Sequence, residues 1–248
     1  MRLKVILALW SGLLTTGGIA QASPFYAPPP PEDDAPPWSG EAELGFTHLQ
    51  GNTNSQTLIA KGRLVWLTGN LTHSLRGEVR HVTQDSETSA EQYLMAARER
   101  IDIEGPHYLF GFTRWEKDRF SGYDYQATAI GGYGRQLVSN ERHILSLETG
   151  PGYRIDSVTD DRDRRLGVIY GALDYRWHFS DTASLGQELS LEATDPNLTT
   201  RSLSTLTARL NSHLALKLSY ELEHNSRPPD AAMARTDHIT SASLLYDW

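Results

Sequence analysis

The chain has 248 residues, of which 31 are acidic and 23 basic, so its formal net charge is −8 at pH 7. This negative charge argues against a general nucleic-acid binder, and the absence of cysteine excludes disulfides, thiolate nucleophiles and cysteine-ligated metals. The hydrophobic content of 39% and the mean hydropathy of −0.46 argue against a helical membrane protein. They leave open a β-barrel, in which only every second strand residue faces lipid.

Residues 1–22 have the pattern of a secretory signal peptide. Arg2 and Lys4 precede the apolar segment Val5–Leu14, and Ala20-Gln21-Ala22 fits the small-x-small rule for cleavage. The apolar segment is too short to span a bilayer as a helix. We therefore expect an exported protein, and cleavage would leave a net charge of about −10 because the removed segment carries two positive charges and no negative ones.

Residues 23–37 are rich in proline, with seven prolines and the acidic trio Glu32, Asp33 and Asp34. This composition predicts an extended, disordered periplasmic tail. A proline motif that binds a partner is the alternative, but the composition alone does not require it.

From residue 38 onward, alternating apolar and polar residues predict about twelve β-strands separated by turn residues. The clearest alternation runs over residues 214–223, where leucines and Tyr220 share one face while lysine, serine and glutamate occupy the other. The fourth and fifth strands are ambiguous, because Glu99 and Arg114 fall on the apparently apolar face. The strands are expected to start near Glu41, Ser55, Leu71, Glu91, His107, Asp124, His143, Leu166, Ala183, Leu198, His213 and Asp237.

The connections between these strands alternate in length. Residues 68–70 and 180–182 are short turns, whereas residues 83–90 and 157–165 are longer and more charged. Only residues 51–54 break the alternation, since they form a tight turn where a longer connection is expected. Short turns on one rim and longer loops on the other are typical of a transmembrane barrel with an even strand number. We therefore predict an all-β chain whose single folded domain is a closed antiparallel transmembrane barrel of about twelve strands, with both termini in the periplasm.

A soluble periplasmic β-sandwich would show similar alternation and is the alternative fold. A sandwich needs no aromatic residues at its strand ends, whereas a membrane barrel carries aromatic girdles at its lipid–water interfaces. The aromatic residues near the predicted strand ends are Trp38, Trp66, Tyr108, Tyr153, Trp177, Phe179, Tyr246 and Trp248. This distribution favours the barrel and a location in the outer membrane.

The last predicted strand alternates to the final position and ends in the aromatic pair Tyr246 and Trp248. We expect it to pair with an early strand and close the barrel, since a free strand edge would otherwise stay uncovered. Tyr246 and Trp248 are predicted to act as interface anchors and as an assembly signal. The expected partners are outer-membrane lipids, lipopolysaccharide, periplasmic chaperones and the barrel assembly machinery, with no nucleic acid.

The first strand reads WSGEAELGFTHLQGNTNS over residues 38–55. This Gly-x-x-x-Leu-Gly-like strand, which runs into Gly51, Asn52, Thr53 and Asn54, resembles the salt-induced outer-membrane protein family, and the likeness extends over residues 38–248. The resemblance implies an outer-membrane location without a settled activity, and a response to salt is only what the family name suggests. A tight hairpin is the favoured interpretation of the motif, because glycine and asparagine tolerate positive φ. A surface polar cluster for lipopolysaccharide is the alternative.

Charged residues recur on the strand face opposite to the apolar one, and in a barrel this face lines the lumen. Early strands contribute mainly basic residues and later strands mainly acidic ones, so the two halves would face each other. The thirteen main candidates for the lumen lining are Lys61, Arg63, Arg76, Arg80, Arg98, Arg100, Arg135, Glu148, Asp174, Glu188, Glu192, Glu221 and Glu223. Further charges on this parity are Glu41, Glu43, Glu78, Asp102, Arg154, Asp156, Arg176, Arg201, Arg209, Lys217 and Asp247.

Two outcomes for these charges stay open, because inward charges must be paired or hydrated. Side chains that meet would form a salt-bridged plug, and the protein would be a structural or ligand-binding barrel. Side chains separated by water would place a transverse field across a narrow pore, which selects ions or small polar or zwitterionic solutes. We favour the narrow or gated passive channel over the plug.

No motif in the chain predicts catalysis or a cofactor, so we expect a protein that is not an enzyme. The nine histidines fall near strand ends, where an amphipathic ring suits an interface, and no close pair has metal-ligand spacing. The distant alternative is a lipid hydrolase built on His48, Asn54 and Ser55. The aspartates within residues 160–163 are interrupted by arginine, which is typical of a solvated loop rather than of a cation site.

Overall fold

The computed structural model describes residues 37–49, 55–84, 87–118, 121, 123–158, 162–195, 197–228 and 235–248. The expected signal peptide, nearly all of the proline-rich tail and the hairpin Gly51, Asn52, Thr53 and Asn54 lie outside the described residues and stay predictions. Within the described ranges, no helix is long and apolar enough to cross a membrane.

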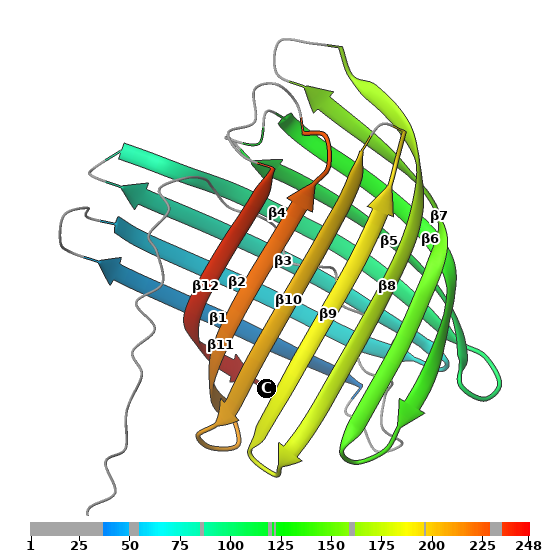
Figure 1. Cartoon of the computed structure of the whole chain (residues 1–248). Helices are drawn as coiled ribbons and strands as arrows, with labels where there is room; N and C mark the ends of the chain where they lie inside the picture. Colours follow the sequence, from blue (N-terminus) through cyan, green and yellow to red (C-terminus); the bar gives the residue numbers. More distant parts are fainter. Residues whose placement is uncertain are drawn as a thin grey trace, which may run out of the picture.

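Within the described residues, twelve strands form one closed antiparallel barrel, which confirms the predicted strand number and closure (Figure 1). Each strand pairs with its sequence neighbours, and β1 (blue) also pairs with β12 (red) to complete the ring. The strands are β1 (Trp38–Leu49), β2 (Ser55–Thr68), β3 (Leu71–Gln84), β4 (Glu87–Asp102), β5 (His107–Asp118), β6 (Tyr123–Ser139), β7 (His143–Val158), β8 (Arg164–Ser180), β9 (Ala183–Ala193), β10 (Leu198–Arg209), β11 (Leu214–Asn225) and β12 (Thr236–Asp247).

The two rims differ in their connections. β1 starts and β12 ends at one rim, which we call the short-turn rim because its connections hold two to four residues. Two of these turns contain a glycine at positive φ, Gly69 at 62° and Gly105 at 73°, a conformation that residues with a side chain rarely adopt. The opposite rim, the long-loop rim, carries the ten-residue connection 226–235. The expectation of a long loop over residues 83–90 is wrong, because only residues 85–86 separate β3 from β4.

Side chains alternate between the lumen and the outer face along each strand. On β11, Ala215, Ser219 and Glu221 are buried inside the barrel. Leu216 and Leu218, between them in sequence, are 45% and 47% exposed on the outer face. The barrel therefore turns mainly polar side chains inward and apolar side chains outward, the reverse of a soluble protein.

The fifth strand departs from this rule and resolves the ambiguity of its sequence. Phe110, Phe112 and Arg114 all point into the lumen and are at most 5% exposed, so the apolar parity of β5 is the inner one. Tyr108 is 0% exposed, which corrects its assignment to an interfacial girdle. The rings belong to an inner hydrophobic cluster of Leu94, Ala96, Tyr108, Phe110, Phe112, Ile130, Val168 and Tyr170. On β4, Glu99 does face outward, where its carboxylate contacts the imidazole of His73.

The junction between β1 and β12 is short. Its ladder joins Glu41–Gly45 to Ser243–Asp247, five residue pairs, whereas β1 and β2 pair over twelve. Trp248 extends the junction through two backbone hydrogen bonds. Its N–H donates to the Gly40 carbonyl at 3.0 Å, and its carbonyl accepts from the Gly40 N–H at 3.1 Å. Any side chain at Gly40 would overlap the indole ring, so this close approach requires glycine. The terminal tryptophan therefore clamps the seam of the barrel.

Candidate functional site

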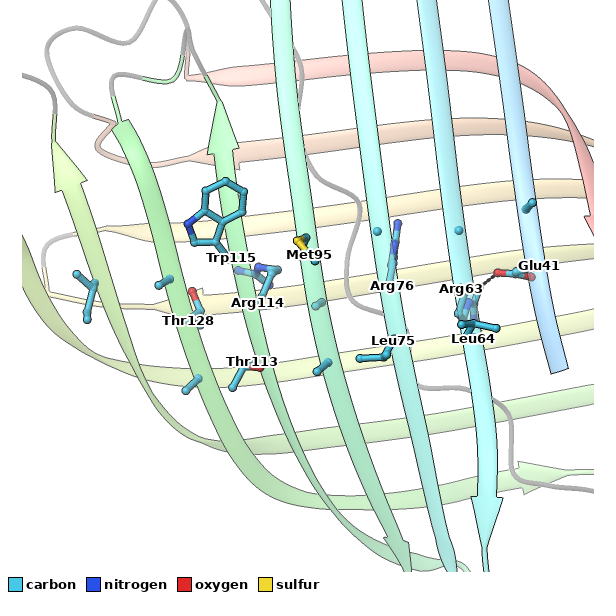
Figure 2. A pocket seen from close by; sticks show the side chains of 18 of the residues that line it. Glu41, Arg63, Leu64, Leu75, Arg76, Met95, Thr113, Arg114, Trp115 and Thr128 are labelled. Carbon is cyan, nitrogen blue, oxygen red and sulfur yellow. Dashed lines mark ion pairs between the residues drawn. The ribbon is translucent and has the colours of Figure 1, made fainter. Parts of the chain in front are cut away.

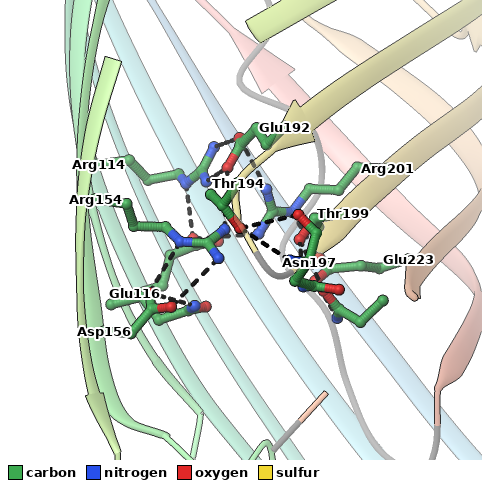
Figure 3. A network of polar contacts seen from close by, with 12 residues as sticks. Arg114, Glu116, Arg154, Asp156, Glu192, Thr194, Asn197, Thr199, Arg201 and Glu223 are labelled. Atoms are coloured by element: carbon green, nitrogen blue, oxygen red, sulfur yellow. Dashed lines mark hydrogen bonds and ion pairs between the residues drawn. The ribbon is translucent and has the colours of Figure 1, made fainter. Parts of the chain in front are cut away.

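Opposite charges from distant strands meet inside the lumen on the side of the long-loop rim (Figure 3). Glu192 on β9 accepts hydrogen bonds from Arg114 on β5 at 3.0 Å and from Arg201 on β10 at 2.9 Å. Arg154 on β7 adds a third cation at 3.7 Å. Three strands lie between β5 and β9 in the ring, so the pair of Arg114 and Glu192 spans the lumen rather than following the wall.

The same network continues to other carboxylates. Arg201 donates to Glu223 at 2.6 Å, and Arg114 donates to Glu116 at 2.7 Å. Arg154 forms an ion pair with its strand neighbour Asp156 at 2.9 Å. Each arginine in this network therefore contacts more than one carboxylate, and the charges are shared rather than joined in isolated pairs.

A second network closes the lumen between β2, β3 and β11. Glu221 accepts hydrogen bonds from Lys61 at 2.6 Å and from Arg80 at 2.8 Å. Arg80 also donates to Glu78 and to Gln92, both at 3.1 Å. Because β12 and β1 separate β11 from β2, these contacts also cross the lumen.

We call these charged residues the ion-pair lattice: Lys61, Glu78, Arg80, Arg114, Glu116, Arg154, Asp156, Glu192, Arg201, Glu221 and Glu223. Its core is closed to solvent, since Glu192 is 0% exposed and Arg80 is 1% exposed. Moving a charge out of water is costly unless opposite charges and hydrogen bonds replace the water. The lattice supplies both, and its paired side chains bridge the lumen at this level.

The wall formed by β4 and β5 places arginines over aromatic rings. Arg98 lies 4.8 Å from the ring centre of Phe110 and forms an ion pair with Glu148. Arg100 lies 3.8 Å from the ring centre of Tyr108, whose hydroxyl donates to Glu148 at 2.9 Å. A ring face attracts a guanidinium and replaces part of its hydration. The sequence pattern gives no sign of this wall, because inward aromatics resemble those of a lipid-facing strand.

The charges between the lattice and the short-turn rim are arranged differently. Arg63 lies directly opposite Arg76 across β2 and β3, and Asp174 lies directly opposite Glu188 across β8 and β9. Each of these two cross-strand pairs therefore places two like charges side by side on the inner face, which is unfavourable by itself. We call these four residues the opposed pairs.

The basic members of the opposed pairs also contact carboxylates along the wall. Arg63 forms an ion pair with Glu41 on β1 (Figure 2), and Arg76 forms one with Glu78 at 3.1 Å. The side chains of Arg63 and Glu41 are 21% and 31% exposed, in contrast to the buried lattice. Solvent therefore reaches this part of the lumen from the short-turn rim.

The structure places twelve of the thirteen predicted lumen residues on the inner face. They comprise five lattice residues, the four residues of the two opposed pairs and three residues of the aromatic wall: Lys61, Arg80, Glu192, Glu221, Glu223, Arg63, Arg76, Asp174, Glu188, Arg98, Arg100 and Glu148. Arg135 is the exception, because it faces outward between the exposed residues Tyr133 and Leu137. Glycines obscure the alternation there, and Gly134 is the inner residue, covered by the ring of Tyr108.

Sequence reasoning misses Arg114 and Glu116, two central members of the lattice. Both share the parity of Phe110 and Phe112, which the pattern indicates as lipid-facing. The signal that could have found them is the charge itself, since an arginine and a glutamate two residues apart are costly on a lipid face.

The described residues include no group of three or more histidine, aspartate or glutamate side chains suited to holding a metal ion. The hydrolase candidates His48, Asn54 and Ser55 lie outside the side chains that the structure describes and stay a prediction. Asp163, from the acidic loop, accepts a hydrogen bond from Ser157 at 2.8 Å, which gives it a structural partner.

An apolar groove of about 770 Å³ crosses the outer face from β1 to β7 (Figure 2). Small residues such as Ala42, Gly62 and Gly77 line it together with Trp115 and Trp248. A Cβ added at Gly62 or Gly77 would meet no atom within 4 Å, so the groove is open on its outer side. The exposed lining of the groove is mostly apolar, which suits acyl chains.

Comparison with known proteins identifies relatives of the chain. A family model described as "Protein of unknown function, DUF481" matches residues 42–248. The uncharacterized protein YdiY of Escherichia coli strain K12 is 32% identical over 227 residues, which cover 92% of this chain and 90% of that protein.

Solved barrels are more distant. The translocator domain of the autotransporter NalP from Neisseria meningitidis has a TM-score of 0.46 and 14% identity over 85% of this chain and 87% of that chain. The KdgM porin in complex with disordered oligogalacturonate has a TM-score of 0.47 and 12% identity over 84% and 98%. At this level of similarity, neither protein informs the activity of this chain.

Proposed function

The chain belongs to the family of proteins of unknown function DUF481, and we propose from its own geometry that it is a non-enzymatic outer-membrane barrel that works as a gated channel, closed at rest by the ion-pair lattice. Its solutes would be ions or small polar molecules. The single observation that carries this proposal is Glu192, which is 0% exposed and held by arginines from three other strands.

The outer face supports a membrane location. Leu44 and Phe46 are each 65% exposed, and Met95 and Ile169 are each 66% exposed, an arrangement that suits lipid and is unfavourable in water. Near the short-turn rim, histidines lie against aromatic rings, as in Trp66 and His73, whose ring centres are 5.0 Å apart. Amphipathic rings at one level are typical of a lipid–water interface. Together with the expected signal peptide, these features favour the outer membrane with the short-turn rim in the periplasm.

The burial of the lumen charges supports the closed state. In a permanently open pore the lumen charges would be hydrated, and their exposed fractions would be high. Arg80, Arg154 and Glu192 are instead at most 2% exposed and contact partners across the lumen. We therefore expect the resting barrel to pass few ions.

The chemistry of the lattice supports a gate rather than a permanent plug. Buried ion pairs add little stability compared with apolar side chains of similar volume, so they are not the most stable way to fill a barrel. Charged side chains can, however, exchange a partner for water, and the same residues would then line an aqueous path. A gate needs this property and a plug does not.

A salt response, which the family resemblance suggests, would begin at the exposed pairs. Arg209 and Asp247 lie 3.6 Å apart at the short-turn rim with side chains 56% and 36% exposed, so dissolved ions screen them. The buried lattice is screened much less. If salt promotes opening, we expect Arg209→Gln to reduce that dependence while leaving the closed lattice in place.

The second candidate is a permanently closed structural or ligand-binding barrel. The inner cluster around Phe110, Phe112 and Tyr170 favours it, because these rings fill one side of the lumen with groups that water cannot separate easily.

Planar-bilayer recording distinguishes the two candidates. The purified barrel should be silent or open briefly, whereas Glu192→Gln, which leaves three arginines without their shared carboxylate, should open often. Glu141→Gln, an equal charge change in an exposed turn, is the matched control. Steady conductance of the unaltered protein would contradict the closed state, and silence of both proteins at every voltage and salt concentration would favour the plug.

A further inference from the structure

Arg135 places a positive charge on the outer face of the barrel, among apolar side chains. It lies four residues before Ser139, where β6 ends at the short-turn rim, and its neighbours on the same face, Tyr133 and Leu137, are 41% and 46% exposed. Among the residues that the structure describes, the Arg135 side chain forms no hydrogen bond and no ion pair. A cation on a lipid-facing surface costs free energy unless water or an anion meets it.

The depth of Arg135 is that of an aromatic belt near the same rim. Tyr133 lies six residues from the end of β6, and Trp177, which stacks with His143 at 6.1 Å, lies three residues from the end of β8. With a rise of about 3.3 Å per residue and a tilt of about 40°, Arg135 lies roughly 10 Å below the strand end. Aromatic belts mark the lipid–water interface, so Arg135 lies at the level of lipid headgroups.

A second polar group lies beside Arg135 on the outer face. His107 is directly opposite Arg135 across β5 and β6, and its Nδ1 is hydrogen-bonded to the hydroxyl of Tyr133. A neutral imidazole has one N–H and a tyrosine has one O–H. Their mutual bond uses only one of these two donors, so one donor remains whichever group donates. The guanidinium and this donor together suit the oxygens of a phosphate.

Two apolar grooves cross the outer face next to these groups. The first has a volume of about 470 Å³, extends from β6 to β9, and is lined by Leu147 and Leu189 with Arg135 at its edge. The second has a volume of about 760 Å³, extends from β5 to β8, and is lined by Leu109 and Ile169. Both volumes lie in the range of roughly 300–1,000 Å³ that is typical of sites for small ligands.

The two grooves meet at one place. Tyr133 and Thr149 line both of them, so the grooves diverge from the strand pair that carries Arg135. Gly171 widens the first groove, since a Cβ added there would meet nothing closer than the Glu148 carbonyl at 4.0 Å. Two chains that leave one headgroup can therefore lie in the two grooves.

We infer that Arg135, together with the pair of His107 and Tyr133, binds the phosphate of a membrane phospholipid whose two acyl chains lie in the two grooves. The charge selects this occupant, because a free anion gains nothing from the grooves and an uncharged lipid gains nothing from Arg135. The inference rests on the proposed membrane location with the short-turn rim in the periplasm, which makes the lipid one of the inner leaflet.

Two other occupants fit the observations less well. A second copy of the chain, docked on the same face by two-fold symmetry, would bring two Arg135 side chains to one level without an anion between them. Lipopolysaccharide has more than two acyl chains and belongs to the opposite leaflet, beside the long-loop rim. The phospholipid matches both the charge and the number of grooves.

Native mass spectrometry of the full mature barrel, released from detergent micelles after titration with lipid, counts the bound lipids. The two probes share their chains: dioleoylphosphatidylglycerol has the phosphate and dioleoylglycerol lacks it. We expect one phosphatidylglycerol to bind about tenfold or more tightly than the diacylglycerol, as one charge-assisted contact implies. Arg135→Leu should weaken phosphatidylglycerol about tenfold and leave the diacylglycerol unchanged. Gly171→Leu, which fills the first groove, should weaken both lipids about threefold, because chain contacts are lost.

Two matched controls make the same substitutions elsewhere on the outer face. Arg165→Leu removes an exposed, outward arginine near the long-loop rim, and Gly77→Leu adds a side chain where a Cβ meets no atom within 4 Å. Both should leave the affinity for phosphatidylglycerol unchanged. Heat-modifiable gel migration identifies the folded barrel in every variant, and if Gly171→Leu does not fold, Gly171→Val takes its place.

Equal binding of the two probes, or an unchanged preference for the phosphate in Arg135→Leu, would overturn the inference. Tighter binding of lipid A than of phosphatidylglycerol would overturn it too, as would a lipid-free dimer that Arg135→Leu abolishes. The titration does not depend on conductance, so a conducting barrel that keeps the lipid preference would contradict only the gate. A barrel that stays soluble without detergent would contradict the membrane location itself.

Discussion

The two halves of the lumen use the same residue types in opposite arrangements. Near the long-loop rim, Arg201 lies directly opposite Glu223 on one side and Ser190 on the other, so its cross-strand neighbours are an opposite charge and a hydroxyl. Near the short-turn rim, Arg63 lies opposite Arg76, and Asp174 lies opposite Glu188. The first arrangement joins charges across the lumen into a closed lattice, whereas in the second the arginines pair with carboxylates along their own wall.

This difference shows that register, more than composition, decides what a charged lumen does. Lys61 lies opposite Glu78 and joins the lattice, whereas Arg63, two residues further along β2, lies opposite Arg76 and belongs to the opposed pairs. One step along a strand face thus separates a residue that closes the lumen from one that faces solvent. Substitutions in the two halves should therefore have opposite effects on stability.

The largest effect is expected from Glu192→Gln. Removing this carboxylate leaves Arg114, Arg154 and Arg201 buried without their shared partner. Breaking a buried ion pair from one side costs roughly 3–5 kcal/mol, and we expect a loss of that size in the free energy of unfolding. Urea unfolding of the barrel in micelles measures it. A loss as small as that of the exposed control Glu141→Gln would show that the lattice is hydrated.

A smaller loss is expected at the seam that keeps both halves in register. Gly40→Val would drive a side chain into the indole of Trp248 and should lower the free energy of unfolding by about 1–3 kcal/mol. Trp248→Ala in the same chain makes room for the valine and should recover part of the loss. Independent, additive effects of the two substitutions would contradict the contact between Gly40 and Trp248.

In the other half, neutralising the opposed pair Asp174 and Glu188 should stabilise the barrel. Asp174→Asn with Glu188→Gln removes a directly opposed like-charge pair, and such pairs cost about 0.2–1 kcal/mol. The free energy of unfolding should therefore rise by that amount, the reverse of Glu192→Gln. A loss above 1 kcal/mol would mean that the two carboxylates are paired like those of the lattice.

The smallest effect is expected outside the lumen, at Arg135. An arginine on the lipid face costs roughly 0–1 kcal/mol near an interface, so Arg135→Leu should be neutral or slightly stabilising. Unfolding of Arg135→Leu and of Arg98→Leu in parallel checks this assignment. Arg98→Leu should be the more destabilising, since Arg98 is buried against Glu148 and Phe110. Strong destabilisation by Arg135→Leu would indicate that the Arg135 side chain faces the lumen.

Strand number, closure and most side-chain directions could be predicted from the sequence, because alternation is a local property. On β11, every second residue from Leu214 to Leu222 is apolar, and that pattern alone fixes which face is inside. The pattern failed where the local chemistry was unusual: Phe110 and Phe112 turn inward, and the glycines around Arg135 leave no alternation to follow.

The partners across the lumen could not be predicted from the sequence. The contact of Arg114 with Glu192 joins β5 to β9, and that of Lys61 with Glu221 joins β2 to β11. These contacts depend on the cross-section of the barrel and on the depth of each residue. Neither the cross-section nor the depth can be inferred from the alternation of a single strand.

Thiol labelling tests the closed lattice most directly, because the chain has no native cysteine. Ser190→Cys places a thiol beside Arg201 at a position only 3% exposed, and Ser184→Cys places one on the same face of β9 near the short-turn rim. With a charged, water-soluble thiol reagent on both sides of a lipid vesicle, we expect Ser184→Cys to react about tenfold or more faster, since the buried thiol reacts only when the lattice opens. Equal rates would show that water passes through the lattice and would contradict a lumen closed at rest.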